Sequence, residues 1–400
     1  SGMERRVRVL HAHIMSGSSE PIVEDSCAYS ITEGAVLSTL CRNGLLKITL
    51  HRPQALNALS LEMIRTLWDL LIRARDDDAV QAVFVRGAGD RAFCAGGDIK
   101  SLYTASLENS TAPRMQFFYH EYRLDYLIAT FPKPYISLLH GITMGGGVGI
   151  SLHGRFRIVT NKFLFAMPET AIGLFPDVGG SYFLSRCPHS IGMYLGLTGD
   201  RVFCDDALFL GLATHVVDAD YLDALEVGLA KLDLSNGLSN EDMDAFLQQF
   251  ASCAHEKKVG PIERDAALIA DIFSRASVEE IVEASKGTPF IDSLLPRCPM
   301  SMLVAFEAQK RVLEGDLSLQ DTFEMEYIVA VHMTSRPDFL EGVRAAVIDK
   351  DNKPAWSADP TLDRTQAQDV VSPIFDTPLT LPPVGPHSEN CHLTLSLDKL

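Results

Sequence analysis

The 400-residue sequence lacks paired cysteines, an excess of basic residues and a long uninterrupted hydrophobic run. Its eight cysteines are scattered, with no CxxC pair and no Cys/His cluster, so the sequence indicates neither a zinc site nor a dithiol redox pair. The formal net charge of −17 argues against nucleic acids and anionic membranes as partners. A local site for an anionic ligand is still compatible with this overall charge.

Three common motifs are also absent, namely GxGxxG, GxxxxGK[ST] and GxSxG. Their absence excludes the simplest sequence cases for dinucleotide binding, P-loop phosphoryl transfer and serine hydrolase chemistry. The least charged stretch, residues 135–154, is about long enough to cross a bilayer. It contains six glycines and two histidines, however, and this composition predicts a strand, a turn and a helix rather than a membrane span.

Residues 1–30 are polar and irregular, which predicts a flexible amino-terminal segment. Arg5, Arg6 and Arg8 accompany a single early acid, Glu4, and this pattern is typical of mitochondrial transit peptides as well as of disordered termini. The last three residues match a peroxisomal signal only loosely. Scattered cysteines fit a reducing compartment. We therefore expect a mitochondrial protein, with the cytoplasm or a peroxisome-like compartment as alternatives.

Hydrophobic patterns predict alternating strands and helices up to about residue 205. Asn43-Gly44 is a hairpin turn signal before a strand at Leu45–Leu50, and Ser60 caps an amphipathic helix. Further strands are predicted at 82–85, 135–139 and 156–159, with another helix at 114–129. This alternation favours a parallel or mixed sheet with right-handed crossovers, so residues 31–205 are expected to form an α/β core that carries the active site.

From Asp205 onward the pattern predicts one helix after another, at 205–213, 221–233, 240–253, 261–273, 277–285, 299–313 and 318–334. We therefore expect a helical carboxy-terminal region over residues 206–356. Residues 357–400 hold six prolines and show little periodicity, which predicts a draped or mobile Pro-rich tail.

Two glycine-rich segments follow predicted strands, AFCAGGDIK at 92–100 and HGITMGGGVG at 140–149. Three successive glycines entering a helix let backbone N–H groups approach a ligand at the positive end of the helix dipole. Two such N–H groups converging on one oxygen would form an oxyanion hole. The alternative is that both segments are tight turns in which glycine only supplies a positive φ.

Together with ITLHRPQALNAL at 48–59 and LTGDR at 197–201, these segments resemble, in order, the enoyl-CoA hydratase/isomerase (crotonase) family. The resemblance covers residues 34–220 well. It implies a crotonase-type spiral of ββα units followed by a helical carboxy-terminal region. It also implies that an acyl-CoA thioester oxygen lies between two backbone N–H groups, which map here to Gly97 and Gly146.

Carboxylates narrow the resemblance to one branch of that family. Hydratases of the family carry two glutamates, of which the first maps to Gly149 and is absent here, whereas the second maps to Glu169. The segment 166–180, with Asp177 eight residues after Glu169, resembles the 3-hydroxyisobutyryl-CoA hydrolases, as do FFYHEY at 117–122 and the residues between 341 and 351. The helix that follows the glycine triplet is expected to place a glutamate at position 149 near the substrate.

This resemblance implies a role for each of three acidic residues. Glu169 would be either the nucleophile or the base that activates water, and Asp177 would bind the substrate hydroxyl, help to protonate the leaving thiolate, or both. Glu121 would contact the substrate, although a helical glutamate is also typical of a solvated face. Two carboxylates in a partly dry cleft push their pKa values apart. Asp98 is expected to cap a helix, and Lys100 is either a contact for the CoA phosphates or solvated.

The expected activity is hydrolysis of a short branched 3-hydroxyacyl-CoA thioester, most simply 3-hydroxyisobutyryl-CoA in valine breakdown. We expect no metal and no separate cofactor, because coenzyme A is part of the substrate. The alternatives are an enoyl-CoA hydratase/isomerase and a non-catalytic member that acts by binding, for example to RNA. An acyl-CoA is the expected partner, without nucleic acid or membrane, and the oligomeric state, including a homo-oligomer, is left open.

Overall fold

The computed structural model describes residues 27–235, 237, 239–251, 258–357 and 371. The predictions for the amino-terminal segment 1–30 and the Pro-rich tail 357–400 therefore fall largely outside the described residues. Residues 27–30, which we expected to be flexible, instead begin strand β1 (Cys27–Glu33).

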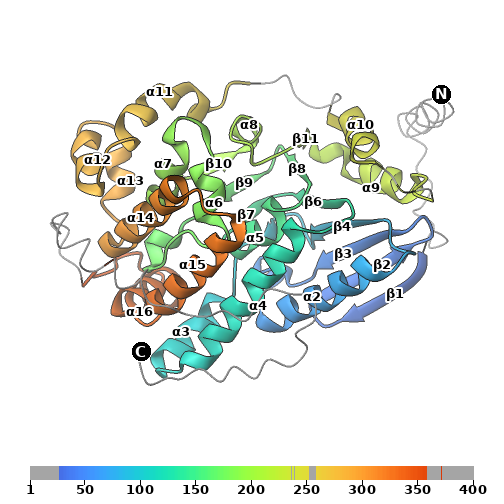
Figure 1. Cartoon of the computed structure of the whole chain (residues 1–400), viewed down its shortest axis with the longest axis horizontal. Coiled ribbons are helices and arrows are strands. Elements are labelled where there is room, and N and C mark those ends of the chain that lie inside the picture. The colour runs from blue at the N-terminus through green and yellow to red at the C-terminus, as the bar shows by residue number, and fades with distance from the viewer. Residues whose placement is uncertain (1–26, 236, 238, 252–257, 358–370, 372–400) are drawn as a thin grey trace.

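Two sheets lie between residues 27 and 217 (Figure 1). The larger sheet has the order β1-β2-β3-β4-β6-β8-β11, in which β1, β2 and β3 are antiparallel and the strands from β3 to β11 are parallel. The smaller sheet has the order β10-β9-β7-β5. The remaining strand bounds are β2 (Val36–Cys41), β3 (Leu45–Leu50), β4 (Ala82–Gly87), β5 (Ala92–Cys94), β6 (Tyr135–Leu139), β7 (Ile142–Met144), β8 (Phe156–Thr160), β9 (Leu164–Ala166), β10 (Val202–Phe203) and β11 (His215–Val217).

Successive strand pairs place one strand in each sheet before the chain enters a helical segment. The pair β4 and β5 precedes α3 (Ile99–Leu107) and α4 (Thr111–Ala129), the pair β6 and β7 precedes α5 (Gly146–Leu152), and the pair β8 and β9 precedes η3 (Glu169–Ile172) and α6 (Gly180–Ser185). This arrangement is the predicted spiral of ββα units. Each turn of the spiral delivers the carboxyl end of a strand to the same edge, where the candidate site lies.

Alternate residues of the buried parallel strands face opposite sides of the larger sheet. Phe84, Ile136 and Ile158 lie in a cluster with side chains from α9 (Leu222–Lys231) and α10 (Asn240–Ala251). Val83 and Val85 point the other way, into the main core with α2 (Leu61–Asp76) and α4. Burial on both faces explains why these strands are continuous apolar runs.

Local sequence signals match the structure in the first half. The Asn43-Gly44 turn joins the antiparallel strands β2 and β3, and the Ser60 side chain accepts a hydrogen bond from Met63 N–H at the start of α2. The weakly charged stretch 135–154 forms β6, β7 and α5, as predicted. Among the described helices, none combines the length and the apolar character needed to cross a membrane.

The helical carboxy-terminal region differs from the prediction in its first helix, in an additional strand and in two additional short helices. The expected helix at 205–213 is only α8 (Cys204–Ala207), and β11 follows inside the region predicted to be helical and joins the larger sheet beside β8. The further helices are α7 (Ile191–Thr198), α11 (Pro261–Phe273), α12 (Val278–Ser285), α13 (Phe290–Leu294), α14 (Pro299–Gly315), α15 (Leu319–Met333) and α16 (Pro337–Val343). Neither α13 nor α16 was predicted, because both are shorter than two full turns. The remaining short helices are η2 (Pro53–Ala55), η4 (Pro188–Ser190), η5 (Ala219–Tyr221) and the π-helix η6 (Arg344–Ile348).

Candidate active site

The two glycine-rich segments lie against each other in the structure. A Cβ atom built on Gly146 would lie 3.2 Å from the Gly97 nitrogen, and one built on Gly96 would lie 3.9 Å from the Gly146 nitrogen. Gly146 is the first residue of α5, so its N–H has no acceptor within the helix. In the part of the chain that the structure describes, neither the Gly97 N–H nor the Gly146 N–H donates a hydrogen bond to a carbonyl oxygen of a loop or turn, or to a side chain. Two backbone donors are therefore close enough to hold one oxygen.

Helix α4 supplies Glu121 beside these glycines. A Cβ atom on Gly97 would lie 3.7 Å from Glu121 Oε1, and one on Gly146 would overlap the same oxygen. Glu121 is 2% exposed, and its Oε1 has no hydrogen-bond partner among the described residues. The reading of Glu121 as a solvated helix residue is therefore wrong, and its side chain faces the glycine pair.

Glu169 and Asp177 both lie within the same buried cluster. Glu169 begins η3, and its Oε1 would lie 3.1 Å from a Cβ atom on Gly145. Its other oxygen, Oε2, has no hydrogen-bond partner in the described part of the chain. Asp177 Oδ2 accepts a hydrogen bond of 2.6 Å from the Tyr122 hydroxyl. The structure thus brings together all five residues that the sequence proposed for the site: Gly97, Glu121, Gly146, Glu169 and Asp177.

Three further residues of the cluster escaped the sequence reasoning. Tyr122 and Asp125 lie on α4 one and four positions after Glu121, and the spacing of four places Asp125 on the same helix face as Glu121. Glu326 comes from α15 and accepts hydrogen bonds from the backbone of the turn that follows Asp177. Helical spacing from Glu121 could have indicated Asp125, whereas no local signal indicates Glu326.

Burial and mutual repulsion make the cluster hold protons. Burial raises the pKa of Glu169 and of Glu121 well above 4.5, and nearby carboxyl groups, above all Asp177, raise them further. Burial also raises the pKa of Asp177 to about 6, although the hydrogen bond from Tyr122 opposes the shift. Burial raises the pKa of Glu326 to about 8. Within the described residues, no ion pair reaches these carboxyl groups, so protons rather than cations balance their charge.

Position 149 faces a carboxyl group of the same buried cluster. A Cβ atom on Gly149 would lie 2.5 Å from Asp125 Oδ2 and 2.9 Å from its Cγ. Asp125 is fully buried, neither of its oxygens has a hydrogen-bond partner in the described structure, and its pKa is raised well above 3.8 by burial and then by Glu121. A carboxyl group from α4 thus occupies the space into which a side chain at 149 would project.

Helix α16 supports the segment that carries Glu169. A Cβ atom on Gly342 of α16 would lie 2.6 Å from the Ile172 Cα, and one on Gly173 would lie 2.6 Å from the Phe339 nitrogen. Gly173 also has a φ of 73°, so glycine is needed there for both space and conformation. This close contact lets the carboxy-terminal region fix the position of η3.

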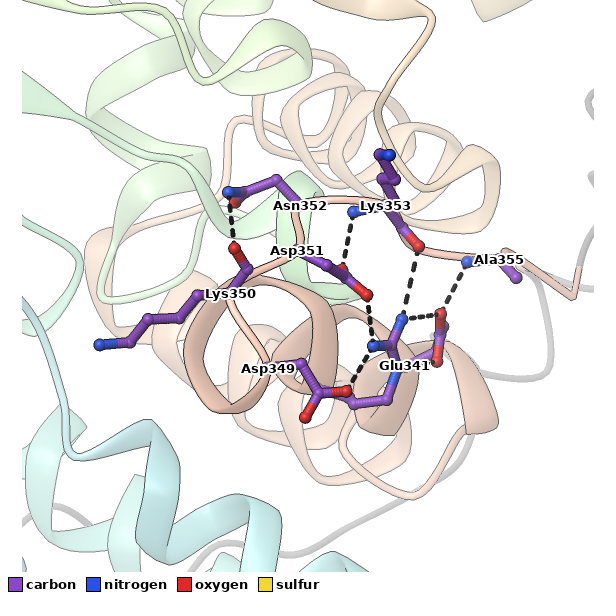
Figure 2. A network of polar contacts seen from close by, with 8 residues as sticks. Glu341, Asp349, Lys350, Asp351, Asn352, Lys353 and Ala355 are labelled. Atoms are coloured by element: carbon purple, nitrogen blue, oxygen red, sulfur yellow. Dashed lines mark hydrogen bonds and ion pairs between the residues drawn. The ribbon is translucent and has the colours of Figure 1, made fainter.

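The chain reversal after α16 is held by a single arginine. Arg344 donates hydrogen bonds of 2.8 Å to both oxygens of Glu341, and bonds of 2.6 and 2.8 Å to Asp349 and Asp351. It also donates to the Lys353 carbonyl, which closes the network drawn in Figure 2. Hydrogen bonding to the guanidinium lowers the pKa of Glu341 to about 2. The residues between 341 and 351 that carried the resemblance therefore contact one another and shape the support for η3.

Several flanking residues serve the fold. Asp98 stands at the N-cap position of α3, but its side chain makes no capping bond and instead accepts a 3.3 Å bond from Arg52, which corrects our expectation. His153 Nε2 lies 2.8 Å from the Val178 carbonyl, and burial lowers the pKa of His153 to about 4, so its neutral ring donates this bond. Within the described residues, no group of three or more His, Cys, Asp or Glu side chains is placed to hold a metal ion.

Comparison with protein families gives a match that spans most of the chain. A family model described as enoyl-CoA hydratase/isomerase matches residues 45–375. The sequence is 43% identical over 318 residues to the mitochondrial 3-hydroxyisobutyryl-CoA hydrolase of Danio rerio, which covers 77% of this chain and 81% of that protein. It is 42% identical over 322 residues to the Homo sapiens protein of the same name, with the same coverage. The Dictyostelium discoideum protein of that name is 36% identical and covers 80% of this chain and 86% of its own length.

Solved structures share the fold. A carnitinyl-CoA dehydratase from Mycobacterium thermoresistibile is 32% identical with a TM-score of 0.78, and the match covers 89% of this chain and 100% of that one. An enoyl-CoA hydratase from Rhodobacter sphaeroides is 34% identical with a TM-score of 0.75, over 85% of this chain and 99% of that one.

Proposed function

Because the chain belongs to the enoyl-CoA hydratase/isomerase family, we propose that it hydrolyses 3-hydroxyisobutyryl-CoA to 3-hydroxyisobutyrate and CoA, a thioester cleavage of valine breakdown. Relatives with that activity in their names match more than three quarters of the chain. Their names also say that they are mitochondrial, and the same compartment is proposed for this protein.

One observation carries this assignment from the structure. Glu169 has one unpartnered, buried oxygen, Oε2, and its other oxygen lies next to Gly145, the residue before Gly146, while position 149 offers no second glutamate and is closed by Asp125. Hydration of a double bond by two glutamates would need a glutamate at position 149, and this chain has glycine there. A thioester carbonyl held by Gly97 and Gly146 would instead lie beside Glu169 as the candidate nucleophile or base, which suits acyl transfer.

In the proposed reaction, a carboxylate oxygen of Glu169 adds to the thioester carbon and the electron pair of the carbonyl moves onto its oxygen. The N–H groups of Gly97 and Gly146 stabilise this oxyanion, a contribution that is typically worth ~10²–10³ in rate for one donor. The oxyanion electron pair then re-forms the C=O bond as the C–S bond breaks, the C–S electron pair leaves on sulfur, and the thiolate takes up a proton from solvent. Water opens the resulting anhydride and restores Glu169. The alternative route has Glu169 remove a proton from water, which attacks the carbonyl directly.

Asp177 is proposed to recognise the 3-hydroxyl group. Its pKa of about 6 makes it ionised near neutral pH, and the Tyr122 hydroxyl occupies only one of its two oxygens. A carboxylate accepts a stronger hydrogen bond from a hydroxyl than a neutral group does. Glu169, with a pKa well above 4.5, gains its reactive form as the pH rises.

The test is release of free thiol across a panel of acyl-CoAs, with loss of the conjugated absorbance of crotonyl-CoA as the measure of hydratase activity. We expect kcat/KM to be highest for 3-hydroxyisobutyryl-CoA and hydration of crotonyl-CoA to be far slower. Hydration that is faster than thiol release would assign the protein to the hydratases. Binding of RNA without thiol release from any substrate would favour a non-catalytic role.

Two accompanying proposals have their own tests. Because two backbone donors and a carboxyl group suffice for the chemistry, no metal or separate cofactor is proposed, and thiol release should survive dialysis against a chelator. Self-association into a homo-oligomer is likewise a proposal, which sedimentation of the purified protein would decide.

A further inference from the structure

The turn that carries Asp177 has an unfavourable backbone. Val178 and Gly179 are both in the left-handed region, with φ values of 54° and 78°, and Gly180 N–H closes the turn on the Asp177 carbonyl at 2.7 Å. Valine is β-branched and rarely adopts a positive φ, so surrounding contacts must hold it there. The direction in which the Asp177 side chain points therefore depends on those contacts.

The contacts come from two distant elements. Glu326 of α15 accepts a 2.6 Å hydrogen bond from Gly179 N–H on one oxygen and a 2.8 Å bond from Ser181 N–H on the other. His153, which follows α5, donates to the Val178 carbonyl. Glu326 is fully buried and lies 147 residues from Gly179 in the sequence, so α15 is tied directly to the turn.

We propose that Glu326 is a positioning residue that aims Asp177 at the 3-hydroxyl group of the substrate. This inference rests on the proposed function, because it takes Asp177 as the group that recognises the hydroxyl. A carboxyl group suits the task because each of its two oxygens accepts from one of the two N–H donors. An amide has one acceptor oxygen and two N–H donors, so glutamine would leave one backbone N–H of the turn facing another donor.

If Glu326 only capped a helix, its replacement would affect stability and not the choice of substrate. Ser181 belongs to the first turn of α6, so Glu326 would also stabilise that helix end if it did nothing else. The chain offers a matched control in Asp206, which is also fully buried and accepts from two backbone N–H groups, those of Ile262 at 3.3 Å and Glu263 at 2.8 Å, at the start of α11. Asp206 makes no hydrogen bond to the turn that carries Asp177.

The experiment compares Glu326→Gln with Asp206→Asn, each alone and combined with Asp177→Asn. The kcat and KM values are measured for 3-hydroxyisobutyryl-CoA and for isobutyryl-CoA, which lacks the hydroxyl, and stability is measured by urea unfolding. Loss of one hydrogen bond, with one buried N–H left facing another donor, predicts a fall of ~10-fold or more in kcat/KM for the hydroxylated substrate in Glu326→Gln. The fall for isobutyryl-CoA should be much smaller.

Coupling to Asp177 gives the decisive readout. Glu326→Gln should change activity by less than about threefold in the Asp177→Asn background, because the group that it positions is already disabled. Asp206→Asn should lower stability without changing the ratio of the two substrates, and its effect should multiply with that of Asp177→Asn. Equal losses on both substrates, or effects of Glu326→Gln and Asp177→Asn that multiply, would reduce Glu326 to a helix cap.

A second variant and a separate outcome for Asp177 keep the test of Glu326 decisive. If Glu326→Gln does not fold, Ser181→Pro removes one of the two N–H donors in the first turn of α6, where backbone N–H groups have no acceptor within the helix, and the same measurements apply to it. Failure of Asp177→Asn to favour one substrate would overturn hydroxyl recognition in the proposed function. The coupling between Asp177 and Glu326 would then still decide whether Glu326 positions Asp177.

Discussion

Replacing Glu169 by glutamine should have opposite effects on activity and on stability. The two side chains have nearly the same shape, but glutamine cannot act as a base or as a nucleophile. Loss of an acid–base group typically lowers the rate by ~10²–10⁴-fold, and we expect at least that loss for thiol release. Removal of an ionisable group from a buried acidic cluster should at the same time stabilise the fold at neutral and alkaline pH.

The size of the stabilisation follows from the pKa of Glu169, which burial and Asp177 raise well above its ordinary value of 4.5. Above pH 4.5 the unfolded chain has lost this proton while the folded protein retains it, so the stability of the wild type falls as the pH rises. The cost is ~1.4 kcal/mol for each pH unit and each proton. The glutamine variant escapes this cost. Its advantage over the wild type should therefore grow by up to ~1.4 kcal/mol per pH unit until the folded pKa is reached.

Urea unfolding of both proteins at several pH values between about 5 and 8 measures this difference, and thiol release at the same pH values measures activity. An advantage that does not change with pH would mean that Glu169 is ionised in the folded protein throughout this range, and our account of the cluster would be wrong. Activity of the glutamine variant near that of the wild type would remove Glu169 from the chemistry.

Four further outcomes are expected. Asp177→Asn should lower kcat/KM more for 3-hydroxyisobutyryl-CoA than for isobutyryl-CoA, and equal losses would leave Asp177 only a role as acid for the thiolate. A single turnover in ¹⁸O-water, with enzyme in excess over substrate, should label Glu169 if water opens an anhydride at its carbonyl; an unlabelled protein with label in the first product would favour activation of water or attack of water at the acyl carbon. Gly149→Glu should not create an efficient hydratase and should destabilise the protein, since the new side chain would meet the buried Asp125 carboxyl at 2.5 Å; rapid hydration of crotonyl-CoA by this variant would contradict the packing. Gly342→Ala should cost ~1–3 kcal/mol in urea unfolding and lower kcat, because its Cβ would press on the Ile172 backbone beneath Glu169; unchanged stability and kcat would mean that α16 gives way without affecting the site.

Features that depend on a few adjacent residues could be predicted from the sequence. The Asn43-Gly44 turn, the Ser60 cap and the glycine triplet are each specified by a few adjacent residues, and each has the predicted local structure. The order of the glycine-rich segments also identified the family, and with it the proposal that Gly97 and Gly146 are the paired donors. Glu169 was found in the same way, because its motif is contiguous.

Tertiary structure alone decided that the carboxyl groups of Asp125 and Glu326 also belong to the cluster. Helix α4 buries residues on all its faces, including Glu121 and Asp125, so no amphipathic pattern marks which acids point inward. Asp125 fills the space beside Gly149 only because α4 packs on α5, and Glu326 reaches the turn after Asp177 only because α15 packs on α4 and α6. Contacts between segments that lie far apart in the chain depend on how whole elements pack, and the sequence around Glu326 carries no signal of its contact with the turn after Asp177.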